Sequence, residues 1–61
     1  MSLAQLRILI VEDDPDAREL MQAVLEQRNA AVATAESVAA AFALLDAATF
    51  DVIISDIGMP E

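Results

Sequence analysis

Two short apolar runs in this chain end directly in acidic residues. Residues 8–11, Ile-Leu-Ile-Val, lead into residues 12–14, Glu-Asp-Asp, and residues 52–55, Val-Ile-Ile-Ser, lead into Asp56. If both runs are parallel neighbours in one sheet, their carboxyl ends lie side by side and three or four carboxylates crowd at one edge. Such crowding costs free energy unless a cation or protons compensate the charge. The pattern therefore predicts a divalent-cation site between the two strand ends.

Size and composition indicate one small α/β domain. A chain of 61 residues buries only about 60% of the surface that its unfolded form exposes, so its stability is marginal. The sequence has no Cys and no His, which excludes disulfides, common zinc sites and catalysis by these side chains. Apolar residues make up 57% of the chain, a composition that suits helices packed on a sheet and not a disordered segment.

The net charge of −8 limits the partners of this segment. A phosphate backbone would be repelled, so nucleic-acid binding is not expected. The apolar runs are too short to span a bilayer, and no basic amphipathic stretch or signal-peptide pattern suggests a membrane. The lack of cysteine fits a reducing compartment, and we expect a cytoplasmic protein.

The first half of the chain predicts a strand followed by a helix. Residues 7–11 are typical of a strand that is buried on both faces. Asp14 is expected to cap the helix that Pro15 begins, Arg28 to lie in its last turn, and Asn29 to adopt the left-handed conformation after it. The apolar face of this helix is expected to contain Ala17, Leu20, Met21, Val24 and Leu25.

The second half repeats this alternation. Residues 31–35 have weak strand propensity and are expected to form an edge strand, and Ser37 is expected to cap a second helix. The apolar face of that helix is expected to contain Val38, Ala41, Phe42 and Leu45, with Leu44 beside it. Residues 51–55 form a third apolar strand. The order strand-helix-strand-helix-strand predicts a parallel sheet with right-handed crossovers.

The acids at the strand ends predict a magnesium site. Ligands of open parallel sheets bind outside the carboxyl ends of the strands, and Mg²⁺ prefers oxygen ligands. We expect Glu12 and Asp13 to form a metal pair with Asp56, and the carbonyl of Gly58 to supply a further oxygen. A carboxylate beside Mg²⁺ can also attack a phosphoryl group, and Asp56, which stands alone on its strand end, suits that role.

Each acid also has a simpler explanation. Asp14 is best explained as a helix cap, Glu12 and Asp13 alone as an acidic loop, and Asp56 alone as a turn residue. The joint pattern in a strand-helix alternation favours the metal site over these separate explanations. Competing motifs fail, because Arg18 breaks a calcium loop and a single glycine excludes a glycine-rich phosphate loop.

Three segments resemble the receiver domain of response regulators. They are residues 8–19 (ILIVEDDPDARE), residues 34–45 (TAESVAAAFALL) and residues 50–60 (FDVIISDIGMP). The resemblance implies a doubly wound, flavodoxin-like sheet with strand order 2-1-3-4-5, of which this chain would contain strands 2-1-3. Residues 1–61 would then be the N-terminal part of a receiver, without the last two strand-helix units.

The resemblance also implies a function in two-component signal transduction. Asp56 would accept a phosphoryl group from a histidine kinase or phosphotransfer protein. Asp13 would bind Mg²⁺ directly, Glu12 mainly through water, and Gly58 through its carbonyl oxygen. Such a module is a phosphoprotein and not an enzyme. Complete receivers also carry a switch Ser or Thr, a Lys and a mobile aromatic residue, none of which maps onto these 61 residues.

A different kind of function remains open. Without further strands, residues 51–55 would form an open apolar edge, and such edges pair with other chains. The chain is then expected to form homo-oligomers through this edge, as a truncated receiver that retains the acids but transfers no phosphoryl group.

Overall fold

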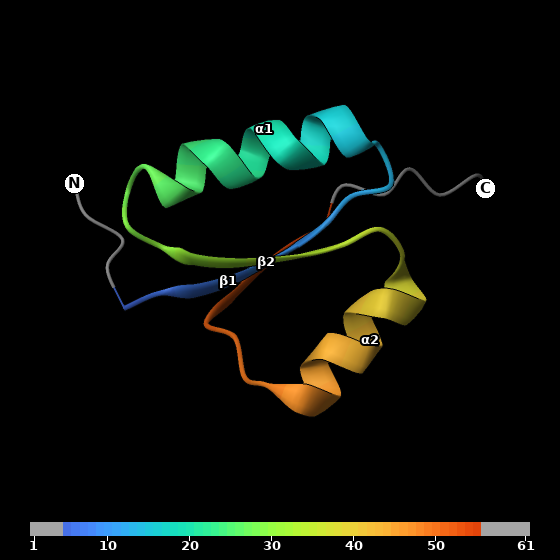
Figure 1. Cartoon of the computed structure of the whole chain (residues 1–61). Coiled ribbons are helices and arrows are strands. Elements are labelled where there is room, and N and C mark those ends of the chain that lie inside the picture. The colour runs from blue at the N-terminus through green and yellow to red at the C-terminus, as the bar shows by residue number, and fades with distance from the viewer. Residues whose placement is uncertain (1–4, 56–61) are drawn as a thin grey trace.

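The computed structural model describes residues 5–55, which form a three-layer α/β unit (Figure 1). The elements are β1 (Arg7–Val11), α1 (Pro15–Glu26), β2 (Ala31–Ala35), α2 (Val38–Ala47) and β3 (Val52–Ser55). All strand pairs are parallel, in the order β2-β1-β3. This arrangement confirms the predicted strand-helix alternation, the order 2-1-3 and the edge position of the second strand.

The central strand β1 supplies the core. Leu9 packs in a cluster on the α2 face of the sheet, whereas Ile8 and Ile10 pack in a second cluster on the α1 face. Leu9 and Ile10 are both completely buried. Because side chains alternate between the two faces of a strand and both faces of β1 are covered, every position from residue 8 to residue 11 is apolar.

Helix α1 begins at the predicted cap and ends earlier than predicted. Asp14 Oδ1 accepts a hydrogen bond of 3.0 Å from the Asp16 N–H, and Pro15 occupies the first turn. The prediction that Arg28 lies in the last turn is wrong, because α1 ends at Glu26. The N–H of Arg28 bonds to the carbonyl three residues back, which tightens the chain before Asn29 takes a positive φ of 72°.

The predicted apolar face of α1 is only partly covered. Met21 and Leu25 pack against the Ile8 and Ile10 cluster. Leu20 is 65% exposed and Val24 is also exposed. Within residues 5–55, one side of the apolar face of α1 therefore packs on the sheet, and the other side is exposed.

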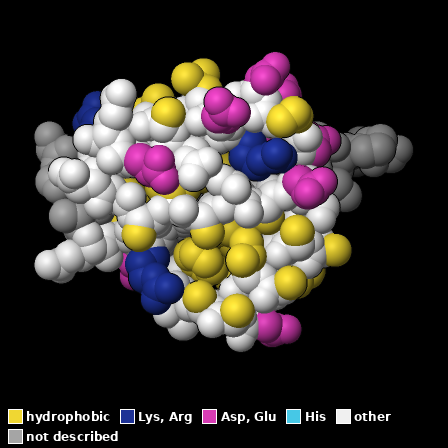
Figure 2. Space-filling view, in the orientation of Figure 1, with side chains coloured by type: hydrophobic (Ala, Val, Ile, Leu, Met, Phe, Trp, Pro, Cys, Tyr) yellow, Lys and Arg dark blue, Asp and Glu magenta, His cyan; other side chains and the backbone are white. Residues whose placement is uncertain are grey.

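Of the predicted apolar face of α2, Ala41 is confirmed as buried and the other three residues are exposed. Ala41 is buried against the sheet and Leu44 packs beside it, whereas Phe42 is 63% exposed. Val38 and Leu45 are exposed as well. The side of α2 that contains Ala40 and Ala41 packs against the alanines of β2, so helix-sheet packing, and not the size of the apolar side chains, decides which face is buried. Hydrophobic side chains consequently gather on the surface beside α2 (Figure 2).

Strand β3 forms the second edge of the described sheet. It begins at Val52, one residue later than expected, and Asp51 before it bonds to the start of β1. The Asp51 carboxylate accepts the N–H of Arg7 at 2.8 Å, and the Asp51 N–H donates to the Arg7 carbonyl at 2.7 Å. Among the described residues β3 pairs with β1 alone, and Ile53 is 52% exposed. No helix in the described part of the chain is long and apolar enough to cross a membrane.

Candidate functional site

The carboxyl ends of the three strands meet at one edge of the sheet. Val11 is the register partner of Ala35 on one side and of Ser55 on the other. The acidic residues 12–14 follow Val11 directly, and Asp56 follows Ser55 in the sequence. The arrangement of the two strand ends is therefore the one that the sequence analysis required.

Glu12 is held firmly at this edge. It is only 4% exposed, and its N–H donates to the Ala35 carbonyl at 3.0 Å. One carboxylate oxygen, Oε1, accepts the N–H of Asp14 at 3.0 Å. Its carbonyl oxygen accepts a hydrogen bond of 2.9 Å from Nη1 of Arg18. Contacts from β2, the loop and α1 thus immobilise the backbone and the side chain of this residue.

The next two acids have different environments. Asp13 is exposed to solvent at the tip of the loop between β1 and α1. Asp14 caps α1, as the simpler interpretation of that residue predicted. The loop therefore contains one buried carboxylate, one exposed carboxylate and one carboxylate that belongs to the helix, which leaves Glu12 and Asp13 as the candidate metal ligands.

The other two predicted site residues, Asp56 and Gly58, lie outside the described residues. Within residues 5–55 no group of three or more His, Cys, Asp or Glu side chains is placed to hold a metal ion. The predicted magnesium site contains only two acids from this range, so the complete set of four residues stays a prediction.

The donors that are described fit a hard cation. Glu12 and Asp13 offer oxygen atoms only, as Mg²⁺ prefers, and the sequence has no thiolate or imidazole ligand to favour a softer metal. The exposure of Asp13 leaves its carboxylate open to a metal that retains several water molecules. One carboxylate oxygen of the buried Glu12 already accepts a hydrogen bond, so Glu12 suits a contact with the metal through a water molecule.

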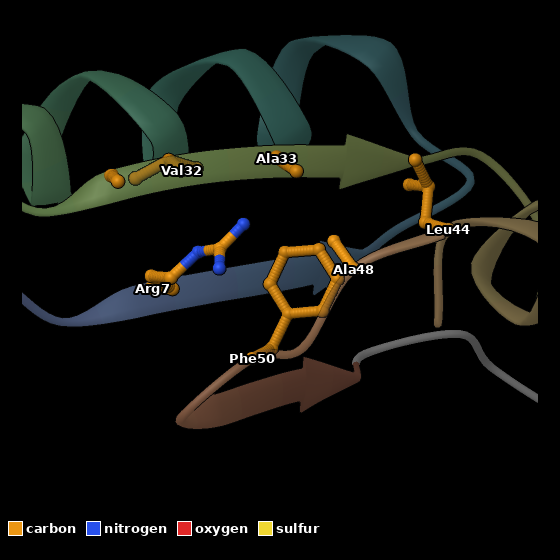
Figure 3. A pocket seen from close by; sticks show the side chains of 7 residues that line it. Arg7, Val32, Ala33, Leu44, Ala48 and Phe50 are labelled. Carbon is orange, nitrogen blue, oxygen red and sulfur yellow. The ribbon is translucent and has the colours of Figure 1, made fainter. Parts of the chain in front are cut away.

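A hollow lined in part by the cationic Arg7 lies at the opposite end of the strands. Its volume is about 280 Å³, and Figure 3 shows Arg7 beside the Phe50 ring. The guanidinium carbon of Arg7 lies 5.9 Å from the centre of that ring, within the range of a cation–π contact. Because Arg7 begins β1 and the acids follow its last residue, this hollow is separate from the candidate metal site.

Parallel strands that alternate with helices, in the order β2-β1-β3, define a doubly wound α/β class of protein, and comparison with known proteins agrees. The family model of the response regulator receiver domain matches residues 8–61, and the chain belongs to this family. No solved structure gave a significant match.

Two curated relatives are similar in sequence to this chain. An uncharacterized 14.6 kDa protein in the sodA1 3' region of Leptolyngbya boryana is 42% identical over 60 residues, which cover 98% of this chain and 46% of that protein. The nisin biosynthesis regulatory protein NisR of Lactococcus lactis subsp. lactis is 42% identical over 53 residues, which cover 87% of this chain and 23% of that protein. The chain thus spans less than half the length of either relative.

The sequence analysis missed the role of Arg18 at this edge. It considered Arg18 only as a residue that breaks a calcium loop. An Arg four residues after the cap residue is one turn into the helix, where a long side chain can reach back to the strand end. That spacing is the signal that would have identified the contact.

Proposed function

We propose that this chain is the N-terminal part of a receiver domain and that Asp56 accepts a phosphoryl group from a histidine kinase or phosphotransfer protein in the cytoplasm. The observation that supports this proposal is the pairing of Val11 with Ser55, since the acids of both strands follow these two residues. Glu12, Asp13, Asp56 and the carbonyl of Gly58 would hold Mg²⁺.

The proposed reaction is a stoichiometric transfer. A carboxylate oxygen of Asp56 attacks phosphorus, the phosphorus–nitrogen bond of the partner's phosphohistidine breaks, and the released imidazole nitrogen takes up a proton. When bound, Mg²⁺ supplies positive charge to the phosphoryl oxygens. Asp13 contributes a carboxylate to the metal, and Glu12 keeps the loop that bears it in place. Because the phosphoryl group stays on Asp56, this chain is an acceptor and not an enzyme.

A small phosphodonor tests the proposal directly. The chain is incubated with acetyl phosphate, with and without Mg²⁺, and its intact mass is measured. We expect a slow, Mg²⁺-dependent gain of one phosphoryl group that Asp56→Asn abolishes, because the chain has no Lys to assist the transfer. The exposed Asp46→Asn on α2 is the matched control and should behave like the parent. A gain that persists in Asp56→Asn would refute the assignment of the acceptor.

The second candidate function is a self-associating module without phosphoryl transfer. It is favoured by the edge of β3, where Ile53 is half exposed and no further described strand pairs. Light scattering at micromolar concentration should then show a homo-oligomer that Ile53→Lys dissociates. A folded monomer for the parent chain would argue against this candidate.

A further inference from the structure

Arg18 binds both ends of the acidic loop. Its backbone N–H donates to the carbonyl of Asp14 at 2.9 Å, and its side-chain Nη1 donates to the carbonyl of Glu12 at 2.9 Å. The side chain is partly buried, so this hydrogen bond is shielded from solvent in part. One residue of α1 therefore holds the first and last residues of the loop whose middle residue is Asp13.

The contact to Glu12 also constrains Asp13. The Glu12 carbonyl belongs to the same planar peptide group as the N–H of Asp13. The Glu12 N–H, which belongs to the preceding peptide group, is bonded to Ala35 on β2, so the bond from Arg18 to the Glu12 carbonyl restricts rotation of the next peptide plane relative to the strand. The orientation of the plane, together with the Asp13 dihedral angles, determines where the Asp13 carboxylate points.

We propose that Arg18 is a positioning residue that holds the exposed Asp13 carboxylate in the orientation required for Mg²⁺. This inference rests on the proposed function, because it assumes that Asp13 is a metal ligand. Arg18 itself need not touch the metal. It acts through the Glu12 carbonyl, in the way that outer-shell partners orient the ligands of metal sites.

Charge repulsion alone and positioning predict opposite effects of removing Arg18 on the affinity for Mg²⁺. A positive charge near a cation site repels the cation, so its loss should strengthen Mg²⁺ binding by about twofold at moderate ionic strength. Loss of an orienting partner should weaken binding, by about tenfold at the low end of the usual range. The sign of the change therefore separates positioning from simple charge repulsion.

The test compares three variants by NMR during titration with MgCl₂. Arg18→Met keeps a long side chain but loses the donor and the charge, and we expect about tenfold weaker binding. Arg28→Met, beyond the end of α1, makes the same charge change at an exposed residue and should bind at least as well as the parent chain. Arg18→Lys retains a donor and should restore most of the affinity. Equal or tighter binding by Arg18→Met would overturn the inference.

A measurement without metal separates this inference from the proposed function. The three-bond coupling between the N–H and Hα of Asp13 should report one φ value in the parent chain and in Arg28→Met, and an averaged value in Arg18→Met. An unchanged coupling in Arg18→Met would overturn the inference whether or not the chain binds Mg²⁺. Failure of the parent to bind Mg²⁺ would count against the proposed metal site alone. Should Arg18→Met not fold, Arg18→Ala is measured in its place, because Ala has the highest helix propensity.

Discussion

Truncation of Leu9 should remove most of the stability of this chain. Leu9 is completely buried on the central strand and packs with Val11, Ala35 and Ala41. Leu9→Ala removes three carbon atoms, worth about 2.4 kcal/mol at roughly 0.8 kcal/mol per buried methylene. The remaining cavity raises the loss in free energy of unfolding to about 3–4 kcal/mol. Domains of this size have about 3–5 kcal/mol in total, so a large fraction of Leu9→Ala should be unfolded.

Ile53→Ala is the matched control, because it also removes three carbon atoms from a strand. Ile53 is 52% exposed, so Ile53→Ala should lose only about half of the transfer free energy, or about 1.2 kcal/mol. Urea denaturation followed by far-UV circular dichroism, at two protein concentrations, measures both losses. If the two substitutions lower the free energy of unfolding equally, the conclusion that β1 forms the centre of the core is wrong.

Two hydrogen bonds at element ends have smaller expected effects. Asp14→Ala removes the acceptor for the Asp16 N–H and should lower the free energy of unfolding by about 1 kcal/mol, whereas Asp14→Asn should retain most of the cap. Equal urea midpoints for the alanine variant and the parent would contradict the capping role. Asp51→Ala removes the acceptor for the Arg7 N–H and should lower the free energy of unfolding by about 1 kcal/mol. Hydrogen exchange at the Arg7 amide should become faster, and unchanged exchange would show that this bond is not formed in solution.

The parts of the fold that were predicted correctly depend on neighbours in the sequence. The cap at Asp14 and the left-handed Asn29 follow from local backbone geometry. The span of β1 follows from a continuous run of β-branched and Leu side chains. Alternation of strands and helices then implied parallel strands, and the family resemblance supplied their order. The early end of α1 was missed because it depends on the tight bonds that lead to Asn29.

The candidate site was predictable only in outline. Acids after two strands that were predicted to be parallel neighbours indicated a cation site, but the difference between the buried Glu12 and the exposed Asp13 was not visible in the sequence. That difference arises because residue 12 still pairs with β2 and accepts bonds from the loop and from Arg18. The part of the prediction that concerns Asp56 and Gly58 lies outside the described residues and awaits the phosphorylation test.

The sequence by itself determined the order of strands and helices, where the helices begin, and which acids follow the strands, because hydrophobic period and capping act over a few residues. Tertiary structure alone decided which side of α2 is buried, how much of β3 is exposed, and that Arg18 reaches the Glu12 carbonyl. These features depend on how closely remote segments approach one another, and this distance is set by side-chain volumes on both partners at once.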